Sequence, residues 1–179
     1  MRIAIETINK IHHLRTAAHV DCLNYFAGLL GYHFPEHDND KNSGPMRTGY
    51  AHINYAKYHP EFTLTEHQIE LYNDMHDEHH RMQPHHLEYY GHDVSKISDI
   101  TLIEMICDWH SANFEQRFIT FEDRRDFTVS DYFNQNLCHD GIHDWSQHQL
   151  TLINDTIEFL SMYANHDAIM KIWFPVMSA

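Results

Sequence analysis

The amino-acid sequence predicts an all-α protein that folds as a single domain of about seven helices. Glycine and proline are scarce, at 6 and 5 of 179 residues, which argues against a β-rich chain with many tight turns. Apolar residues recur at intervals of three and four in several segments, the period of a helix that buries one face. A chain of 179 residues with 42% apolar side chains is sufficient for one hydrophobic core.

The N-terminal third of the chain is expected to hold two helices separated by a polar loop. Apolar side chains at helical spacing predict a helix over residues 4–31, which Gly31 ends. Residues 34–45 are rich in Asn, Asp, Gly and Pro, so they are expected to form a loop. A second helix is expected over residues 46–58, because Pro60 disfavours helical geometry in the residue before it.

Capping signals and apolar periodicity predict the remaining helices. Thr65 with Gln68 has the form of a capping box, and Thr128 with Asp131 is expected to open a short helix. The expected elements are residues 65–83, a short helix over 84–90, a helix that begins at Ser98 or Asp99, the short helix from Thr128, and a long helix over 144–164. The apolar tail from Ile169 to Val176 is expected to pack back onto the domain.

Composition limits the classes of partner and the cellular compartment. A net charge of −14 leaves no general attraction for duplex nucleic acid. The three cysteines form no CxxC pair and suit a reducing compartment. The sequence shows no secretory signal and no apolar run of about 18 residues. We therefore expect a cytoplasmic protein that binds neither a membrane nor duplex nucleic acid.

Histidines and aspartates occur in an order that indicates a metal-dependent hydrolase. The order is His19, then the pair His37-Asp38, then a histidine cluster between residues 76 and 86, then Asp108. Imidazoles and carboxylates hold zinc, manganese or ferrous iron in hydrolytic sites. A metal site with an open position can activate water near neutral pH. The cluster consists of His76, His79, His80, His85 and His86.

The position of each candidate ligand in the chain has a physical reason. His37 and Asp38 lie where a loop meets a helix, so both side chains can face one ion, and the carboxylate can bridge two ions. His76, His79 and His80 are three and four residues apart and share a helix face. Asp108 lies in an apolar helix, where a carboxylate is costly to bury unless it is paired or bound to metal.

These residues resemble the H…HD…D pattern of the HD-domain superfamily of metal-dependent phosphohydrolases. The histidines between the HD pair and the last aspartate are similar to those of its two-metal branch. Residues 37–109 more closely resemble a little-characterised bacterial and phage family of unknown function, whose motifs are HD-x-S-K, HH-x-x-N-x-HH-x-E-Y-W and E-M-x-x-D-W. The matching segments are HDNDK at 37–41, HHRMQPHHLEYY at 79–90 and EMICDW at 104–109.

Two departures and one alternative register accompany this resemblance. Asp40 replaces the serine of the first motif, and Gln83 replaces the asparagine of the second. Residues 92–96, HDVSK, also match HD-x-S-K. We prefer His37-Asp38, because this pair precedes the histidine cluster, as the order of the superfamily requires.

The resemblance implies a helical bundle of the HD-domain type with one or two divalent ions (Mn, Fe, Co, Zn or Mg). The metal-binding core would cover about residues 15–112. The resemblance does not extend to the C-terminal helical part, residues 113–179, which could form a lid, a homodimer contact or scaffold; Trp145 and the long final helix favour the last two. The first ion would be held by His19, His37, Asp38 and Asp108. The second would be held by His80 and His86, with Asp38 bridging; His79 and His85 are the alternatives in the other register.

The implied reaction is hydrolysis of a phosphate ester or anhydride, with a nucleotide as the small-molecule substrate. Lys41 and Arg81 would bind the phosphoryl oxygens, and Glu88 or Glu104 would orient water or a ligand imidazole. A cyclic nucleotide and a signalling oligonucleotide stay open as substrates. Two other functions fit the same residues: a di-iron oxygenase of the same fold, and a non-catalytic helical protein that binds metal or nucleotide. The aromatic candidates for stacking on a base, or for core packing, are Tyr50, Tyr55, Tyr89, Tyr90 and Trp109.

Overall fold

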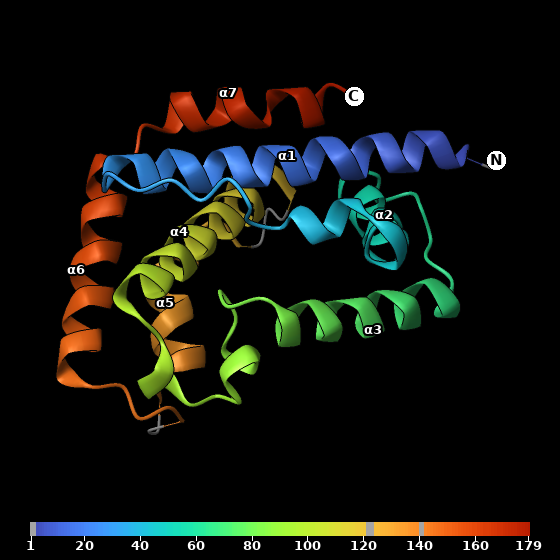
Figure 1. Ribbon diagram of the computed structural model, residues 1–179. Coiled ribbons are helices and arrows are strands. Elements are labelled where there is room, and N and C mark those ends of the chain that lie inside the picture. The colour runs from blue at the N-terminus through green and yellow to red at the C-terminus, as the bar shows by residue number, and fades with distance from the viewer. Residues whose placement is uncertain (1–2, 121–123, 140–141) are drawn as a thin grey trace.

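The N-terminal helix α1 (Ile5–Leu29) is the element against which most other helices pack (Figure 1). In the computed structural model, which describes residues 3–120, 124–139 and 142–179, this 25-residue helix lies between α7 on one side and α2 and α4 on the other. Its length allows it to contribute to two separate hydrophobic clusters and to the polar site between them.

The regular elements in the described part of the chain are all helices, with no strand, which confirms the predicted all-α class of about seven helices. Short 3-10 turns and π-helical turns connect some of the α-helices. None of the described helices has both the length and the apolarity needed to cross a bilayer. The α-helices are α1, α2 (Gly44–Tyr58), α3 (Glu66–Met82), α4 (Asp99–Glu115), α5 (Val129–Tyr132), α6 (Gln147–Tyr163) and α7 (His166–Met177).

Side-chain caps define where several helices begin. The capping boxes predicted at Thr65 and Thr128 are both present, and Ser98 is the cap of α4. The expected start of the long helix at Asp144 is wrong by three residues, because Ser146 caps α6 at Gln147. The predicted apolar tail forms α7 and packs along α1.

The main hydrophobic core lies between α1, α4, α6 and α7. Its centre consists of fully buried side chains, with 0% of their surface exposed: Leu23, Leu102, Ile106, Ile153, Leu160 and Trp173. A smaller cluster joins α1 to α2 through Ile8, Ile11, Ala51 and Tyr55. The core thus fixes the directions of α1 and α4, two of the helices that carry ligand candidates.

A close approach between α2 and α3 places the end of α3 near the site. The approach occurs at Gly49, where a Cβ atom would lie 2.6 Å from Met75 Cγ. A larger residue at position 49 would therefore push α3 and its histidines outward.

We expect Ile106→Ala to lower the free energy of unfolding by about 2–5 kcal/mol, because removal of a fully buried side chain leaves a cavity. Ile100 lies on the same helix and is 53% exposed. Its alanine variant is the matched control, with an expected change below about 0.5 kcal/mol. Denaturant unfolding followed by circular dichroism measures both, and equal losses would contradict the assigned buried face of α4.

Candidate metal centre

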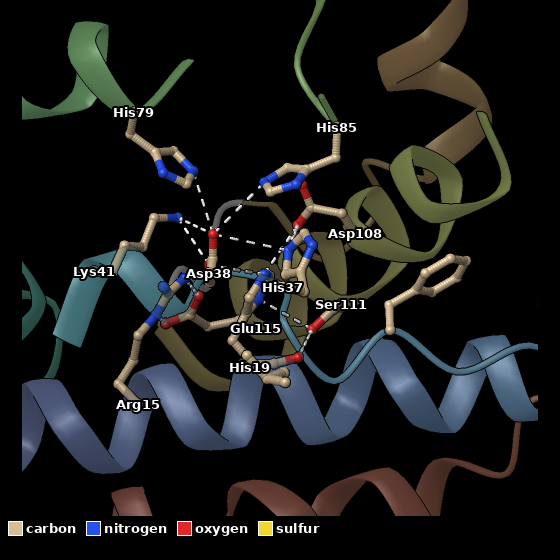
Figure 2. A network of polar contacts seen from close by, with 12 residues as sticks. Arg15, His19, His37, Asp38, Lys41, His79, His85, Asp108, Ser111 and Glu115 are labelled. Carbon is tan, nitrogen blue, oxygen red and sulfur yellow. Dashed lines mark hydrogen bonds and ion pairs between the residues drawn. The ribbon is translucent and has the colours of Figure 1, made fainter. Parts of the chain in front are cut away.

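Side chains from five parts of the chain gather around the carboxylate of Asp38 (Figure 2). Asp38 precedes the 3-10 turn η1 (Asn39–Asn42) and has a φ of 59°, in the left-handed region that few residues other than glycine adopt. An unusual backbone conformation of this kind is frequent at functional sites. The other convergent residues are His19 from α1, His37 from the same loop, His79 from α3, His85 and His86 from the turn after α3, and Asp108 from α4.

A buried histidine on α1 holds this loop in place. His12 Nδ1 accepts a hydrogen bond from Asn54 Nδ2 at 2.9 Å, so its Nε2 donates to the Lys41 carbonyl oxygen, also at 2.9 Å. Burial lowers the pKa of His12 to about 4, which keeps the ring neutral in this bridging role. The loop is therefore attached to both α1 and α2.

The first group of ligand atoms consists of His19, His37, Asp38 and Asp108. His19 Nε2 lies 2.9 Å from Asp108 Oδ1 and 3.7 Å from Asp38 Oδ2. His37 Nε2 lies 3.7 Å from Asp108 Oδ1 and 3.8 Å from Asp38 Oδ1. Two donors at about 2.1 Å from one tetrahedral ion lie roughly 3.4 Å apart, so these separations fit a single divalent ion.

The second group lies on the other side of the same carboxylate. Asp38 Oδ1 is 3.2 Å from His79 Nε2 and 3.7 Å from His85 Nε2. His86 Nε2 is 3.0 Å from His79 Nε2. His79, His85 and His86 each place one ring nitrogen within 4.8 Å of the other two. Asp38 therefore has one oxygen toward His19 and the other toward His79 and His85, the arrangement that a bridging carboxylate requires.

Unpartnered buried atoms at the centre indicate that a cation fits there. His37 Nε2 and His85 Nε2 are each buried without a hydrogen-bond partner, and Asp38 Oδ1 is buried with an ion-pair partner, Lys41, but no hydrogen bond. Buried polar atoms nearly always have a partner, because burial without one costs free energy. A divalent ion accepts lone pairs from imidazole and carboxylate and would satisfy all three atoms. The donor set of nitrogen and oxygen suits zinc, manganese, iron or cobalt.

Hydrogen bonds behind the rings orient the ligand nitrogens inward. His37 Nδ1 lies 3.0 Å from Glu104 Oε1, and His79 Nδ1 lies 2.8 Å from Asp40 Oδ2. A proton on Nδ1 that is donated to a carboxylate leaves the Nε2 lone pair free for a metal. This pattern of carboxylate, histidine and open lone pair is typical of metal sites.

His19 is oriented in the same way by a hydroxyl group. Ser111 Oγ donates to the His19 carbonyl oxygen at 2.9 Å and lies 3.1 Å from His19 Nδ1. Since the hydroxyl proton is used on the carbonyl, the oxygen can accept the Nδ1 proton, which leaves the Nε2 lone pair available to a cation held between His19 and Asp108.

The charges of the centre explain the direction of its pKa shifts. Burial alone would raise the pKa of Asp38, but Lys41 and His37 hold it well below its usual value. Lys41 Nζ lies 2.8 Å from both carboxylate oxygens. Burial opposes protonation of His37, yet the carboxylates of Asp38, Asp108 and Glu104 raise its pKa to about 10. The centre thus carries an excess of negative charge that favours a bound cation.

The two alternative pairs of histidine ligands, His80 with His86 and His79 with His85, lie differently with respect to Asp38. His79 and His85, the alternatives, lie against Asp38, whereas His86 contacts His79 and His80 lies farther out. His80 is turned toward the rim, where its ring stacks on His86 at 3.8 Å and its Nδ1 lies 3.2 Å from Glu88 Oε1. His80, His86 and Glu88 form a separate group of possible ligand atoms at this rim, so the expectation that His80 and His86 hold the second ion stays a prediction, with His79 and His85 as the alternatives. His79 and His80 face different sides because neighbouring helical residues point about 100° apart.

Two further expected site residues lie away from the centre. Arg81 is exposed and pairs with Glu78 on the outer face of α3, so it does not reach phosphate at the centre. Glu88 lies at the rim, where it contacts His80, one of the candidate ligand imidazoles. Glu104 does contact His37, as expected for a residue that orients a ligand.

Asp40 and Ser111 complete the centre but were not among the predicted residues. Asp40 was treated only as a departure from the serine of the motif, although it lies two residues after Asp38. Ser111 lies three residues after Asp108, on the same face of α4, and this spacing was the available signal.

Two cavities open onto the centre and share His80, Asp108 and Ala112 in their walls. The polar cavity has a volume of about 130 Å³, and its walls include the cationic side chains of Arg15, Lys41 and Lys57. The aromatic cavity has a volume of about 220 Å³, and its walls include Trp109, Phe127 and Tyr132. The ligand atoms therefore lie where a cationic pocket and an aromatic pocket meet.

We expect Asp38→Asn to weaken binding of divalent metal more than about 100-fold, because this carboxylate touches both ligand groups. Asp93→Asn is the matched control, since Asp93 belongs to the alternative HD-x-S-K register and bonds to Ser95 and Lys96 away from the centre. Elemental analysis and competition with a chromophoric chelator measure the affinity. If only the Asp93 variant loses metal, Asp93 and not Asp38 is the metal-binding aspartate of the HD pair.

We expect Asp40→Asn to weaken metal affinity by about 10–100-fold, because the amide no longer accepts the His79 proton as a carboxylate does. Asp77→Asn, at a 70% exposed position on α3, controls for loss of one negative charge. The same competition assay applies, and an unchanged affinity of the Asp40 variant would exclude His79 as an oriented ligand.

Comparison with known proteins adds a family assignment. Residues 8–166 match one family, described as a family of unknown function, DUF5662. No curated protein and no solved structure gave a match. The match spans all of the convergent ligands and most of the helices. The chain therefore belongs to the family of unknown function DUF5662.

Proposed function

We propose that the protein is a metal-dependent phosphohydrolase that acts on a nucleotide. The observation that carries the proposal is the position of the buried ligand atoms at the junction of a cationic and an aromatic pocket. A phosphate group and a base need these two environments, joined at the reacting phosphorus. The resemblance to HD-domain phosphohydrolases supports the same reaction class.

Seven residues would hold the metal. His19, His37, Asp38 and Asp108 suit one ion, and His79, His85 and His86 suit a second ion that shares Asp38. Metal at this position supplies Lewis acidity toward water and toward the phosphoryl oxygens. Lys41 is paired with Asp38 and lines the polar cavity. It would therefore lie beside a phosphoryl group bound in that cavity.

Arg15 is held in a fixed orientation at the wall of the polar cavity. Its Nε and Nη2 donate to the two carboxylate oxygens of Glu115 at 3.0 Å and 2.5 Å, and the Tyr58 hydroxyl donates to the same carboxylate at 2.9 Å. A guanidinium group in such a two-point contact keeps its other N–H groups available in a defined direction. We assign Arg15 to phosphate orientation in place of Arg81.

The aromatic cavity supplies the contacts that a base requires. Trp109 and Tyr132 pack edge to face with ring centroids 5.8 Å apart, and both line the cavity. Base stacking on aromatic rings tolerates any base, because every base has a π face. The amide side chains of Asn113 and Gln116 in the same wall can hydrogen-bond to base edges.

The cytoplasm is the compartment that we propose for this reaction. Cys22, Cys107 and Cys138 are free thiols, and two of them are buried in the core as small apolar side chains. A reducing compartment suits such thiols and supplies nucleotides.

The function is tested with protein purified without chelator, loaded separately with Mn, Co, Zn, Mg or Fe, and incubated with a panel of nucleotides. We expect release of phosphate or nucleoside, read by chromatography. Asp108→Asn is expected to lower the rate by about 10³-fold, which corresponds to loss of several kcal/mol of transition-state stabilisation. Asp99→Asn, at an exposed position in the first turn of α4, is the matched control.

The other outcomes distinguish the competing functions. Tightly bound iron with oxygen uptake and no hydrolysis would identify an oxygenase. Metal and nucleotide binding without turnover of any tested nucleotide would identify a binding protein and would contradict the proposed hydrolysis.

A further inference from the structure

Lys57 is the cation of the polar cavity that has no partner. It lies on α2 and lines the cavity with Arg15 and Lys41. Arg15 is paired with Glu115, and Lys41 is paired with Asp38. Within residues 3–120, 124–139 and 142–179, by contrast, no hydrogen bond or ion pair involves the Lys57 side chain. Lys57 is partly buried, and an ammonium group that is partly removed from water without an ion-pair partner costs free energy, so its place in the cavity favours a bound anion.

The protonation of Lys57 fits this role. Burial lowers the pKa of Lys57 to about 8, while Glu115 acts to raise it and Arg15 and Lys41 act to lower it. The ammonium form is therefore still the major form at pH 7. A phosphate anion beside it would stabilise that form further.

Tyr50 offers a second unpaired donor in the same wall. Its side chain is buried, with 5% of its surface exposed, and its hydroxyl has no hydrogen-bond partner in the described structure. The Lys41 ammonium lies over the Tyr50 ring at 5.0 Å from its centroid. An ammonium group and a hydroxyl group are thus both directed to a small cavity that already has two further cations in its walls.

The size of the polar cavity limits what it can hold. Its volume of about 130 Å³ is well below the roughly 300–1,000 Å³ of pockets that hold drug-sized ligands. It suits one phosphoryl group, whereas an ester with a second organic substituent would place that substituent against charged walls. The nucleoside then occupies the adjoining aromatic cavity, past His80 and Asp108.

We infer that Lys57, together with Tyr50, binds the terminal phosphate of the substrate and that the substrate is a nucleoside phosphomonoester. The inference rests on the proposed function for the reaction itself. Hydrolysis breaks the ester P–O bond, water supplies the new oxygen on phosphorus and a proton to the leaving hydroxyl, and the products are a nucleoside and inorganic phosphate. Inorganic phosphate therefore fits the same pocket as the product.

The test measures binding of inorganic phosphate to the metal-loaded protein at pH 7 by calorimetry. We expect Lys57→Met to weaken phosphate binding by about 10- to 100-fold, the effect of losing one charged hydrogen bond. Lys57→Arg is expected to keep affinity within a few-fold of the unmodified protein, which shows that charge matters and that the position tolerates replacement. Lys171→Met, which removes one exposed lysine from α7, is the matched control and is expected to have no effect.

Turnover supplies a second readout. In Lys57→Met, kcat/KM for a nucleoside monophosphate is expected to fall by a similar factor, while that for bis(p-nitrophenyl) phosphate, a diester, stays within a few-fold. Metal content is measured in every variant and is expected to be unchanged.

The outcomes separate this inference from the proposed function. If Lys57→Met binds phosphate as tightly as the unmodified protein, the role of Lys57 is wrong even where hydrolysis occurs. If phosphate binding depends on Lys57 but no ester is hydrolysed with any metal, the anion pocket stands and the proposed reaction fails. Equal losses for the monoester and the diester would contradict the monoester preference.

Discussion

The burial of one carboxylate group, that of Asp38, is the constraint on which the rest of the site depends. A carboxylate removed from water needs positive charge and hydrogen-bond donors around it, or it destabilises the fold. Here an ammonium group and imidazoles from the same loop, α1 and α3 supply them. The turn that holds Asp38 is in a left-handed conformation and is attached to α1 through His12. The helices are thus arranged so that several segments can reach one buried oxygen pair.

The charge balance of the centre links this constraint to metal binding. Four carboxylates, from Asp38, Asp40, Glu104 and Asp108, lie among the imidazoles, whereas Lys41 is the one lysine or arginine that contacts Asp38 in the described chain. The raised pKa of His37 expresses this excess of negative charge. A divalent ion would supply the same positive charge at the unpartnered atoms and would release protons as it binds. The cationic and aromatic pockets then flank the ion.

Local signals in the sequence predicted the helices well, because caps and apolar periodicity act within a few residues. Thr65 with Gln68 and Thr128 with Asp131 both cap helices as predicted. The order of His19, Asp38 and Asp108 also identified residues that converge. The choice between His79 and His80 was not determined, since it depends on the rotation of α3 about its axis, which packing at Gly49 and Met75 sets. Lys57 and Arg15 carry no local signal, because only the crossing of α1 and α2 places them in one cavity. The HD-domain resemblance stays a prediction.

The central claim is that divalent metal is held on both sides of the Asp38 carboxylate. Anomalous X-ray diffraction from crystals of manganese- or zinc-loaded protein, recorded at the absorption edge of the metal, tests it most directly. We expect anomalous peaks beside Asp38. One peak should lie near His19, His37 and Asp108 and, where two ions bind, a second should lie near His79, His85 and His86. Peaks only at the rim beside His80 and Glu88, or an unoccupied centre in crystals grown with excess metal, would contradict it.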